Sequence, residues 1–229
     1  RHSASSTFRS HLKMRSREKN DQCKLEAALQ DDRTFGTFID PVRTVAFTGH
    51  RSYKIYASAR GENRLRVQET VIARTERAVR LLYAQGYDTF LCGMAMGFDL
   101  WAAWAVLSVK PDFPGVRLIA VMPFPGQEAK YPDADKRLYH EIMEEADHSI
   151  CLYDRYTSNR DYIDRNRAML DHASMLVCYF NGESGGTAST VSEARNREMQ
   201  ILNICGHRAA RRYNHNVDDR LVTEIMKIR

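Results

Sequence analysis

The chain has 229 residues, of which 43% are apolar, so it is long enough to bury a full hydrophobic core. Its formal net charge of +5 comes from the two ends, because residues 41–205 carry equal numbers of basic and acidic side chains. A neutral central domain argues against a groove that tracks a polyphosphate backbone, so nucleic acid is not an expected partner.

The cysteines form no Cys-x-x-Cys pair, and three of the five lie in apolar runs. This usage indicates buried thiols in a reducing compartment, and no metal site is expected. No apolar stretch approaches the roughly 18 residues that cross a bilayer. We therefore expect a cytoplasmic protein with no membrane contact.

Three parts are expected along the chain. Residues 1–40 are polar and predict an N-terminal tail or arm, with one short helix near Leu25–Leu29. Residues 41–205 predict the folded domain, and residues 206–229 predict a basic, helical C-terminal extension.

Within the domain, short apolar runs alternate with longer amphipathic stretches. Strands are predicted over 44–48, 89–92, 116–122, 149–153, 175–180 and 200–205. Helices are predicted over 63–85, 98–109, 133–146, 162–172, 187–198 and 218–228. Residues 52–62 are expected to be a loop, and one hypothesis is that it folds over a bound base as a lid. This alternation predicts an α/β fold, a doubly wound and mostly parallel sheet flanked by helices.

Glycine-rich turns follow three of the predicted strands. They read Thr48-Gly49-His50-Arg51, Gly93-Met94-Ala95-Met96-Gly97-Phe98-Asp99 and Gly182-Glu183-Ser184-Gly185-Gly186-Thr187. Parallel strands end together at one edge of the sheet, so these turns converge on one ligand. Glycine allows backbone N–H groups to approach an anion closely at a helix N-terminus. The sequence therefore predicts a phosphate-binding crevice at the carboxyl edge of the sheet.

Polar side chains accompany these turns. Arg51 can bind a phosphate bidentately and His50 can donate to the same group, unless Arg51 only pairs with a surface carboxylate. Asp99 can accept from a ribose hydroxyl or can simply cap its helix. Thr187 and Thr190 lie three residues apart on a first helical turn, so both can donate to a phosphate.

Two further segments bring polar or aromatic groups towards this edge. Pro123 and Phe124 end the third strand; Phe124 either stacks on a base or, as we favour, closes the core. Gln127 can contact an amide or a ribose. Arg165 or Asn166 is expected to face the crevice, the alternative being a solvated helix face.

Five motifs, taken in order along the chain, resemble those of the YpsA-like family of the SLOG superfamily. They are Thr-Gly-His-Arg, Gly-Met-Ala-Met-Gly-Phe-Asp, Pro-Phe-Pro-Gly-Gln, Asp-Arg-Asn-Arg-Ala-Met and Gly-Gly-Thr-Ala-Ser-Thr. That superfamily groups the DprA (Smf) and Lonely Guy proteins, and the resemblance covers about residues 43–205. It implies a Rossmann-like sheet that binds a nucleotide or nucleotide-derived ligand, such as ADP-ribose or NAD. It also implies a homodimer by analogy.

On this resemblance, the ligand-binding residues are expected to be Thr48, Gly49, His50, Arg51, Gly93, Met94, Gly97, Asp99, Pro123, Phe124, Gln127, Arg165, Asn166, Gly185, Gly186, Thr187 and Thr190. No cofactor other than the nucleotide-derived ligand is expected. The leading hypothesis is a sensor or a weak nucleotide-processing protein.

Two relatives imply rival functions. Lonely Guy proteins are phosphoribohydrolases; Arg165 falls at their arginine, but Thr190 falls at their catalytic glutamate. Since threonine supplies no carboxylate, hydrolysis of that kind would need another acid, and Asp99 with Arg165 are the catalytic candidates. DprA proteins bind single-stranded DNA with a loop that has an arginine where this chain has Met96, so DNA binding is the third hypothesis.

Overall fold

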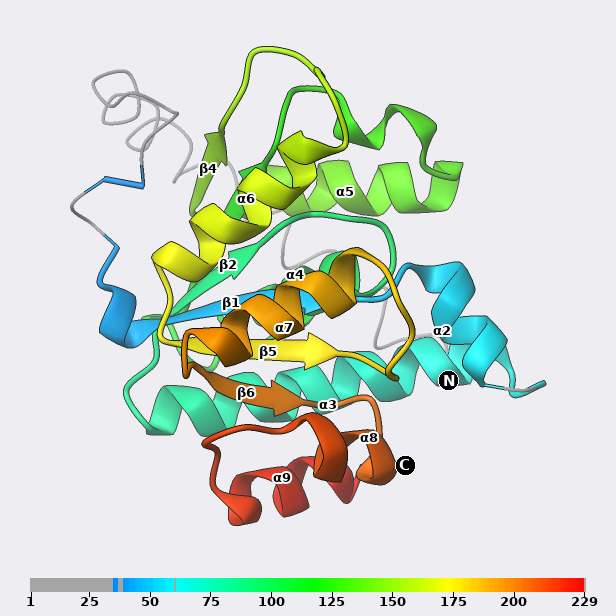
Figure 1. Cartoon of the computed structure of the whole chain (residues 1–229), viewed down its shortest axis with the longest axis vertical. Coiled ribbons are helices and arrows are strands. Elements are labelled where there is room, and N and C mark those ends of the chain that lie inside the picture. Colours follow the sequence, from blue (N-terminus) through cyan, green and yellow to red (C-terminus); the bar gives the residue numbers. More distant parts are fainter. Residues whose placement is uncertain (1–34, 37–38, 60, 229) are drawn as a thin grey trace.

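The computed structural model describes residues 35–36, 39–59 and 61–228, and its centre is a six-stranded parallel sheet (Figure 1). The strands are β1 Thr44–Gly49, β2 Thr89–Cys92, β3 Arg117–Met122, β4 His148–Cys151, β5 Met175–Tyr179 and β6 Gln200–Asn203. Their order is β4-β3-β2-β1-β5-β6, so the chain winds outward from β1 to β4 and then returns to add β5 and β6. The predicted doubly wound α/β fold is confirmed, and its winding reverses between β1 and β5.

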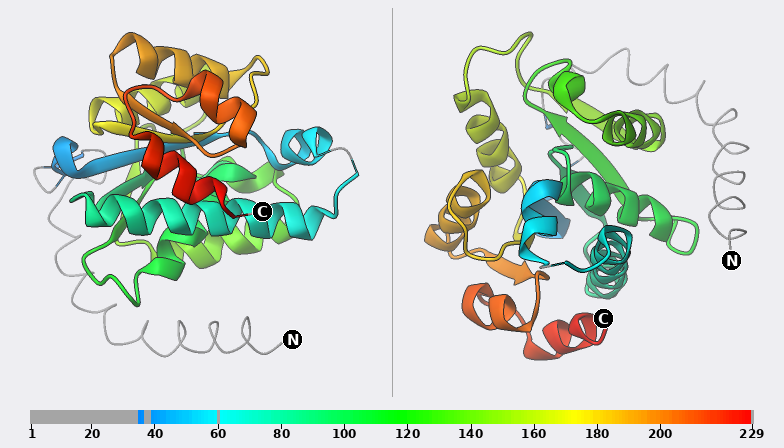
Figure 2. Two further views of the ribbon diagram at one scale, coloured as in Figure 1. Left: turned by 90° about the horizontal axis from the view of Figure 1, so that it is seen from below. Right: turned by 90° about the vertical axis from the view of Figure 1, so that its right-hand side faces the viewer.

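Helices cover both faces of this sheet (Figure 2, left). On one face lie α3 Arg64–Ala84, α4 Phe98–Val109 and α5 Asp133–Glu145, and on the other lie α6 Arg160–Asp171 and α7 Gly186–Asn196. Side chains alternate along each strand, so Val45 and Phe47 pack on the first face while Ala46 packs on the second. Burial on both faces explains why the strands read as continuous apolar runs.

Two segments differ from the sequence-based prediction. The prediction of a loop at 52–62 is wrong for its first part, which forms helix α2 Ser52–Ser58 because Ile55 is fully buried in the core. The C-terminal extension holds α8 His207–Tyr213 as well as α9 Asp219–Met226. Two short 3₁₀ helices, η1 Pro41–Arg43 and η2 Gln127–Lys130, precede β1 and follow β3.

The end of the predicted N-terminal arm packs on the domain. Phe35 and Ile39 are buried against the face that carries α6 and α7, and Phe35 stacks on His172 with ring centroids 4.0 Å apart. The helix predicted near Leu25–Leu29 lies outside the described residues. Over the described part of the chain, every helix is too short or too polar to cross a bilayer.

A buried amide joins the ends of β5 and β6. Asn203 is fully buried; its Nδ2 donates to the Phe180 carbonyl at 2.7 Å, and its Oδ1 accepts from the N–H of Phe180 and of Cys205, each at 3.1 Å. These bonds satisfy three backbone groups where the two strands end, beside the glycine-rich turn that follows β5.

Replacing Asn203 by alanine should destabilise the protein strongly. The substitution leaves three backbone groups unpaired, of which the two on Phe180 are buried, and each buried unpaired group costs about 1–3 kcal/mol. We expect a loss of at least about 2 kcal/mol in urea unfolding, whereas Asn196→Ala, at an exposed position on α7, should change stability by less than about 0.5 kcal/mol. Equal losses in the two variants would contradict this role for Asn203.

Candidate functional site

The turns after β1 and β2 touch through their backbones at the carboxyl edge of the sheet. Gly97 has a φ of 92°, and a Cβ there would collide with the backbone of Arg51 and Ser52. The Phe98 N–H also donates to the His50 carbonyl at 3.1 Å. Only glycine allows this approach at position 97, so the predicted convergence of these two turns has a direct structural basis.

The turn after β5 joins the same edge through contacts with His50 and Lys54. His50 Nε2 lies 2.6 Å from Asn181 Oδ1, and Lys54 Nζ donates to the Ser184 carbonyl at 3.0 Å. Burial lowers the pKa of His50, and the Asn181 bond opposes part of that shift. Sequence reasoning identified His50 but missed Lys54 and Asn181, which carry no motif of their own.

The N-terminus of α7 faces outward beside Lys54. Gly185 precedes the helix with a φ of 134° and no side-chain cap, and the first turn holds no acidic residue. Gly185 and Gly186 are exposed, and a Cβ at Gly186 would meet nothing within 4 Å. The uncapped N–H groups of such a helix end favour an anion.

Asp99 and Arg165, the two catalytic candidates, lie together inside the protein. They are only 5% and 3% exposed, and Arg165 Nη1 donates to the Gly93 carbonyl and to the Val121 carbonyl, the latter at 3.3 Å. Burial raises the pKa of Asp99, and the positive charges of Arg165 and Arg51 offset part of the effect. Asp99 Oδ2 accepts a hydrogen bond from the Ala95 N–H at 3.3 Å, so the carboxylate binds the backbone of the β2–α4 turn.

That turn is held in a strained conformation. Met94 has a φ of 58° although it is not glycine, and its side chain is fully buried. Its carbonyl accepts from Gln127 Nε2 at 3.3 Å and from the Tyr131 hydroxyl at 3.2 Å. Gln127 also donates to the Gly93 carbonyl at 3.2 Å. The candidate Gln127 thus holds the turn, and Tyr131, which the sequence analysis missed, assists it.

Buried polar atoms around this turn have no hydrogen-bond partner within the described part of the chain. They are Arg51 Nη1, Gln127 Oε1, Glu128 Oε2 and Arg165 Nε. Because an unpaired buried polar atom costs free energy, such atoms mark a place that water or a ligand group would complete.

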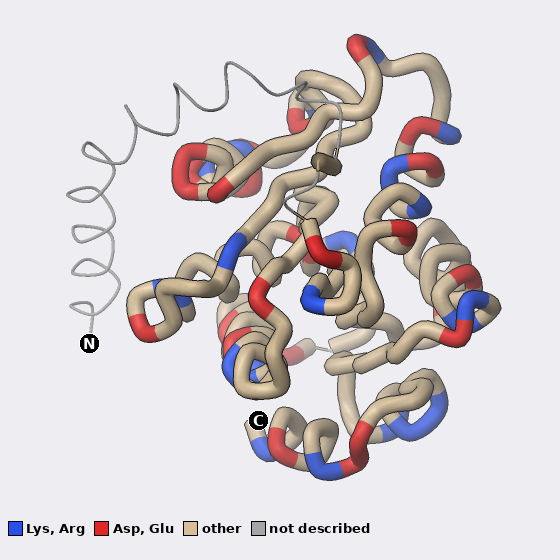
Figure 3. Tube along the Cα trace, turned by 90° about the vertical axis from the view of Figure 1, so that its left-hand side faces the viewer, with Lys and Arg blue, Asp and Glu red and all other residues tan. Residues whose placement is uncertain are grey.

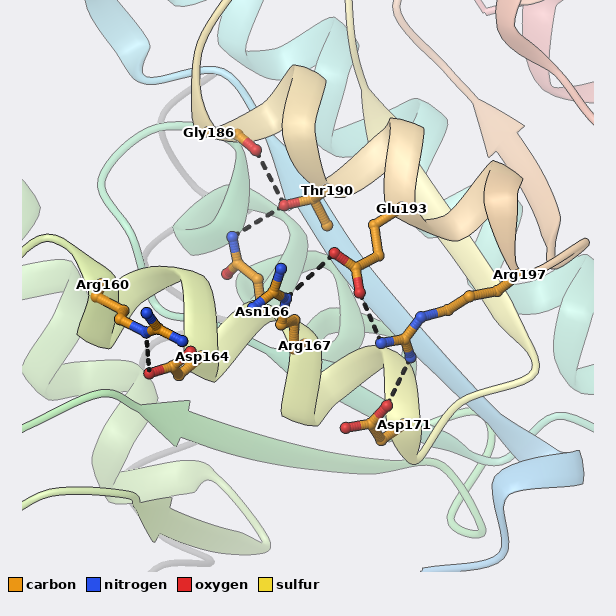
Figure 4. A network of polar contacts seen from close by, with 9 residues as sticks. All are labelled: Arg160, Asp164, Asn166, Arg167, Asp171, Gly186, Thr190, Glu193 and Arg197. Carbon is orange, nitrogen blue, oxygen red and sulfur yellow. Dashed lines mark hydrogen bonds and ion pairs between the residues drawn. The ribbon is translucent and has the colours of Figure 1, made fainter.

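Asn166 and Thr190 meet between α6 and α7 (Figure 4). Asn166 Nδ2 donates to Thr190 Oγ1 at 2.9 Å, and that hydroxyl donates to the Gly186 carbonyl at 3.0 Å. Farther along the same helices, Glu193 binds Arg167 and Arg197, and Arg197 also binds Asp171. Both candidates are therefore engaged in the contact between α6 and α7, directly behind the N-terminus of α7.

The remaining candidates occupy different places. Thr48 and Gly49 form the end of β1, and Thr187 is half-buried in the first turn of α7. Pro123 and Phe124 are buried at the end of β3, where Phe124 makes edge contacts with Tyr156 and Tyr162 at centroid distances of 5.2 and 5.4 Å. This aromatic group lies at the end of β3, and β2 separates β3 from β1 and β5 in the sheet.

Comparison with known proteins places the chain in a family. The model of the YspA SLOG family matches residues 45–204. A UPF0398 protein of Halalkalibacterium halodurans is 24% identical over 162 residues, which cover 69% of this chain and 84% of that protein. A UPF0398 protein of Bacillus pumilus is 23% identical over 68% of this chain and 83% of its own.

Solved structures share the fold at low identity. DNA processing protein A (DprA) of Streptococcus pneumoniae matches with a TM-score of 0.48 and 20% identity over 70% of this chain, which spans about half (49%) of that protein. The Helicobacter pylori protein of the same name, described by its single-stranded DNA binding mode, matches with a TM-score of 0.45 and 17% identity, over 71% of this chain and 64% of its own.

One prediction needs correction. The neutral charge of residues 41–205 led us to regard nucleic acid as an unlikely partner, and this prediction is contradicted, because the two solved structures described above are DNA processing proteins. Net charge averaged over a domain does not report where the charges gather, so it excludes less than we inferred from it. The family match extends from β1 to just beyond β6 and includes the turns after the first five strands. Because it covers more than half of the chain, this chain belongs to the YspA SLOG family.

Proposed function

We propose that this protein binds a nucleotide-derived small molecule of the ADP-ribose or NAD type where β1 and β5 end. The phosphate would lie at the N-terminus of α7. The observation that carries the proposal is the pairing of an uncapped, acid-free helix start at Gly185–Gly186 with the ammonium group of Lys54. Both features attract an anion, and ligands of doubly wound sheets bind where the winding reverses.

Lys54 is already held close to this helix end. Its Nζ lies 3.6 Å from the position of a Cβ on Gly185 and 3.8 Å from the Glu183 carboxylate. Glu183 is half exposed, so its ion pair with Lys54 is weak and an arriving phosphate could replace it. The Glu183 carboxylate is thus the group with which a ligand would compete.

The strained β2–α4 turn supports the rest of the proposed site. Strained backbone gathers at functional sites, and Met94 keeps its conformation through Gln127 and Tyr131. In the proposed site, Arg51 approaches the second phosphate or the ribose of the ligand, and the buried Gly93–Gly97 turn supports the Arg51 backbone from below.

The arrangement favours binding or sensing over hydrolysis. Thr190 stands where the hydrolytic glutamate of the Lonely Guy pattern would be, and its hydroxyl is occupied by Gly186 and Asn166. Asp99, the alternative acid, is buried beneath the β2–α4 turn. Wild-type protein incubated with AMP should therefore release no adenine by chromatography; release that is lost in a folded Asp99→Asn variant would establish the hydrolase instead.

Gly186→Glu should abolish ligand binding without unfolding the protein. The new side chain meets open space, and a carboxylate at the first position of a helix stabilises it by about 0.3–1 kcal/mol. We expect ADP-ribose, NAD or AMP to raise the melting temperature of the wild type but not of this variant. Asn196→Glu adds the same charge at the other end of α7 and should keep the shift. A ligand shift that persists in Gly186→Glu would place the phosphate elsewhere.

Lys54→Ala and Glu183→Gln should change affinity in opposite directions. Loss of a charge-assisted hydrogen bond worth about 1.5–3 kcal/mol weakens binding by roughly tenfold to a hundredfold. Removal of the competing carboxylate should tighten it by about two- to fivefold, because an exposed ion pair is worth under about 1 kcal/mol. Isothermal titration with ADP-ribose measures both, with Lys227→Ala, directly after α9, as the control. A parallel change in the two variants would contradict the competition.

A further inference from the structure

Helix α8 exposes a cluster of arginines. Arg208, Arg211 and Arg212 are all exposed, and residues 206–217 contain no Asp or Glu. Figure 3 shows the basic positions of this helix, and acidic positions on the neighbouring α9. Across the described ranges, no carboxylate lies within ion-pair distance of these three guanidinium groups. The excess positive charge of the C-terminal extension is therefore concentrated in one place.

The arginines share one side of the helix. Positions 208, 211 and 212 are spaced by three and four residues, which places them on one face, while Ala210 is buried against the core. Arg195 of α7 extends the cluster, because its Nη2 donates to the Tyr213 carbonyl at the end of α8 at 3.4 Å. We call Arg195, Arg208, Arg211 and Arg212 the α8 basic face.

A cavity of about 460 Å³ adjoins this face between α8 and the start of α9. Its lining includes Arg211, His207, Asn214, Asn216, Thr223 and Asp219. Most of these side chains offer hydrogen-bond donors, and Asp219 is the one carboxylate in the lining. The volume falls within the range of sites that hold small ligand groups, so a phosphate with its sugar can enter.

The side chains of this surface favour one class of anionic partner over the others. The large exposed apolar side chains of the described residues lie on other elements, so α8 and α9 offer no apolar anchor for a bilayer or for the core of a protein interface. Arginine binds phosphate bidentately, and neutral amide and hydroxyl groups beside it are typical of contacts to phosphate and sugar. The surface therefore fits a chain of phosphates better than a membrane or an acidic protein.

We propose that the α8 basic face and the adjoining cavity bind the phosphodiester backbone of nucleic acid. This site is separate from the proposed nucleotide site at the N-terminus of α7, and it involves none of the residues assigned there. It reads no base sequence, since the structure offers it cations and neutral donors and no exposed aromatic platform on α8 or α9.

The test compares two triple variants of the full chain. One carries Arg208→Gln, Arg211→Gln and Arg212→Gln; the control carries Arg66→Gln, Lys136→Gln and Arg137→Gln, which removes the same charge from α3 and α5 and leaves α8 and its cavity unchanged. Fluorescence anisotropy with labelled oligodeoxythymidylate is measured over a series of salt concentrations. The α8 variant should flatten the slope of log K against log salt by about 2, since each single-strand contact contributes about 0.7. The control should keep the wild-type slope.

The outcomes separate the alternatives. Oligouridylate and a DNA duplex, used as further probes, should show the same dependence on α8, because the proposed contact is to the phosphate backbone. Wild-type protein that binds none of these probes, or equal slopes in the two variants, would overturn the proposal. So would α8-dependent binding to phosphatidylserine vesicles without binding to oligonucleotides. Both variants should retain any melting shift with ADP-ribose, so failure here is distinguishable from failure of the nucleotide site.

Discussion

A single buried guanidinium organises the carboxyl edge of the sheet. Arg165 begins on α6, on one face of the sheet, and donates to carbonyls of Gly93 and Val121 where β2 and β3 end. Its charge is tolerated because Asp99 lies close by and carbonyl oxygens accept hydrogen bonds from its N–H groups, whereas an isolated buried charge costs several kcal/mol. A Cβ at Gly93 would occupy the position of this guanidinium, so glycine and arginine at these two positions depend on each other.

The topology then decides what this edge can do. Because the winding reverses between β1 and β5, their following turns diverge to opposite faces and leave the N-terminus of α7 open to solvent. The turn after β2 instead packs under Arg51 and Ser52 and is buried. One edge thus combines a rigid interior, built around Arg165, with an exposed rim at Gly185–Gly186. This division explains why some residues of the glycine-rich turns and their polar neighbours support the site from the interior, while others are accessible to a ligand.

The sequence allowed much of this fold to be predicted, because buried parallel strands form apolar runs that glycine-rich turns interrupt. Helix α2 escaped prediction since its burial depends on one residue, Ile55, whose contacts come from distant parts of the chain. The glycine turns of the site were predictable from backbone requirements. Their supports were not: Tyr131, Asn181 and Lys54 act through contacts that only the folded chain creates. Equally, the sequence could not reveal that Asp99 and Arg165 would be turned inward.

The C-terminal extension also closes one side of the sheet. Ile201 of the edge strand β6 exchanges two backbone hydrogen bonds with His215, and the Asn203 N–H donates to the Asn214 side chain at 2.7 Å. An open edge strand is a template on which another chain can add a strand. Here the protein's own return segment occupies that template, so a second copy cannot extend the sheet across β6. A homodimer of this protein would therefore not be expected to join two sheets through β6.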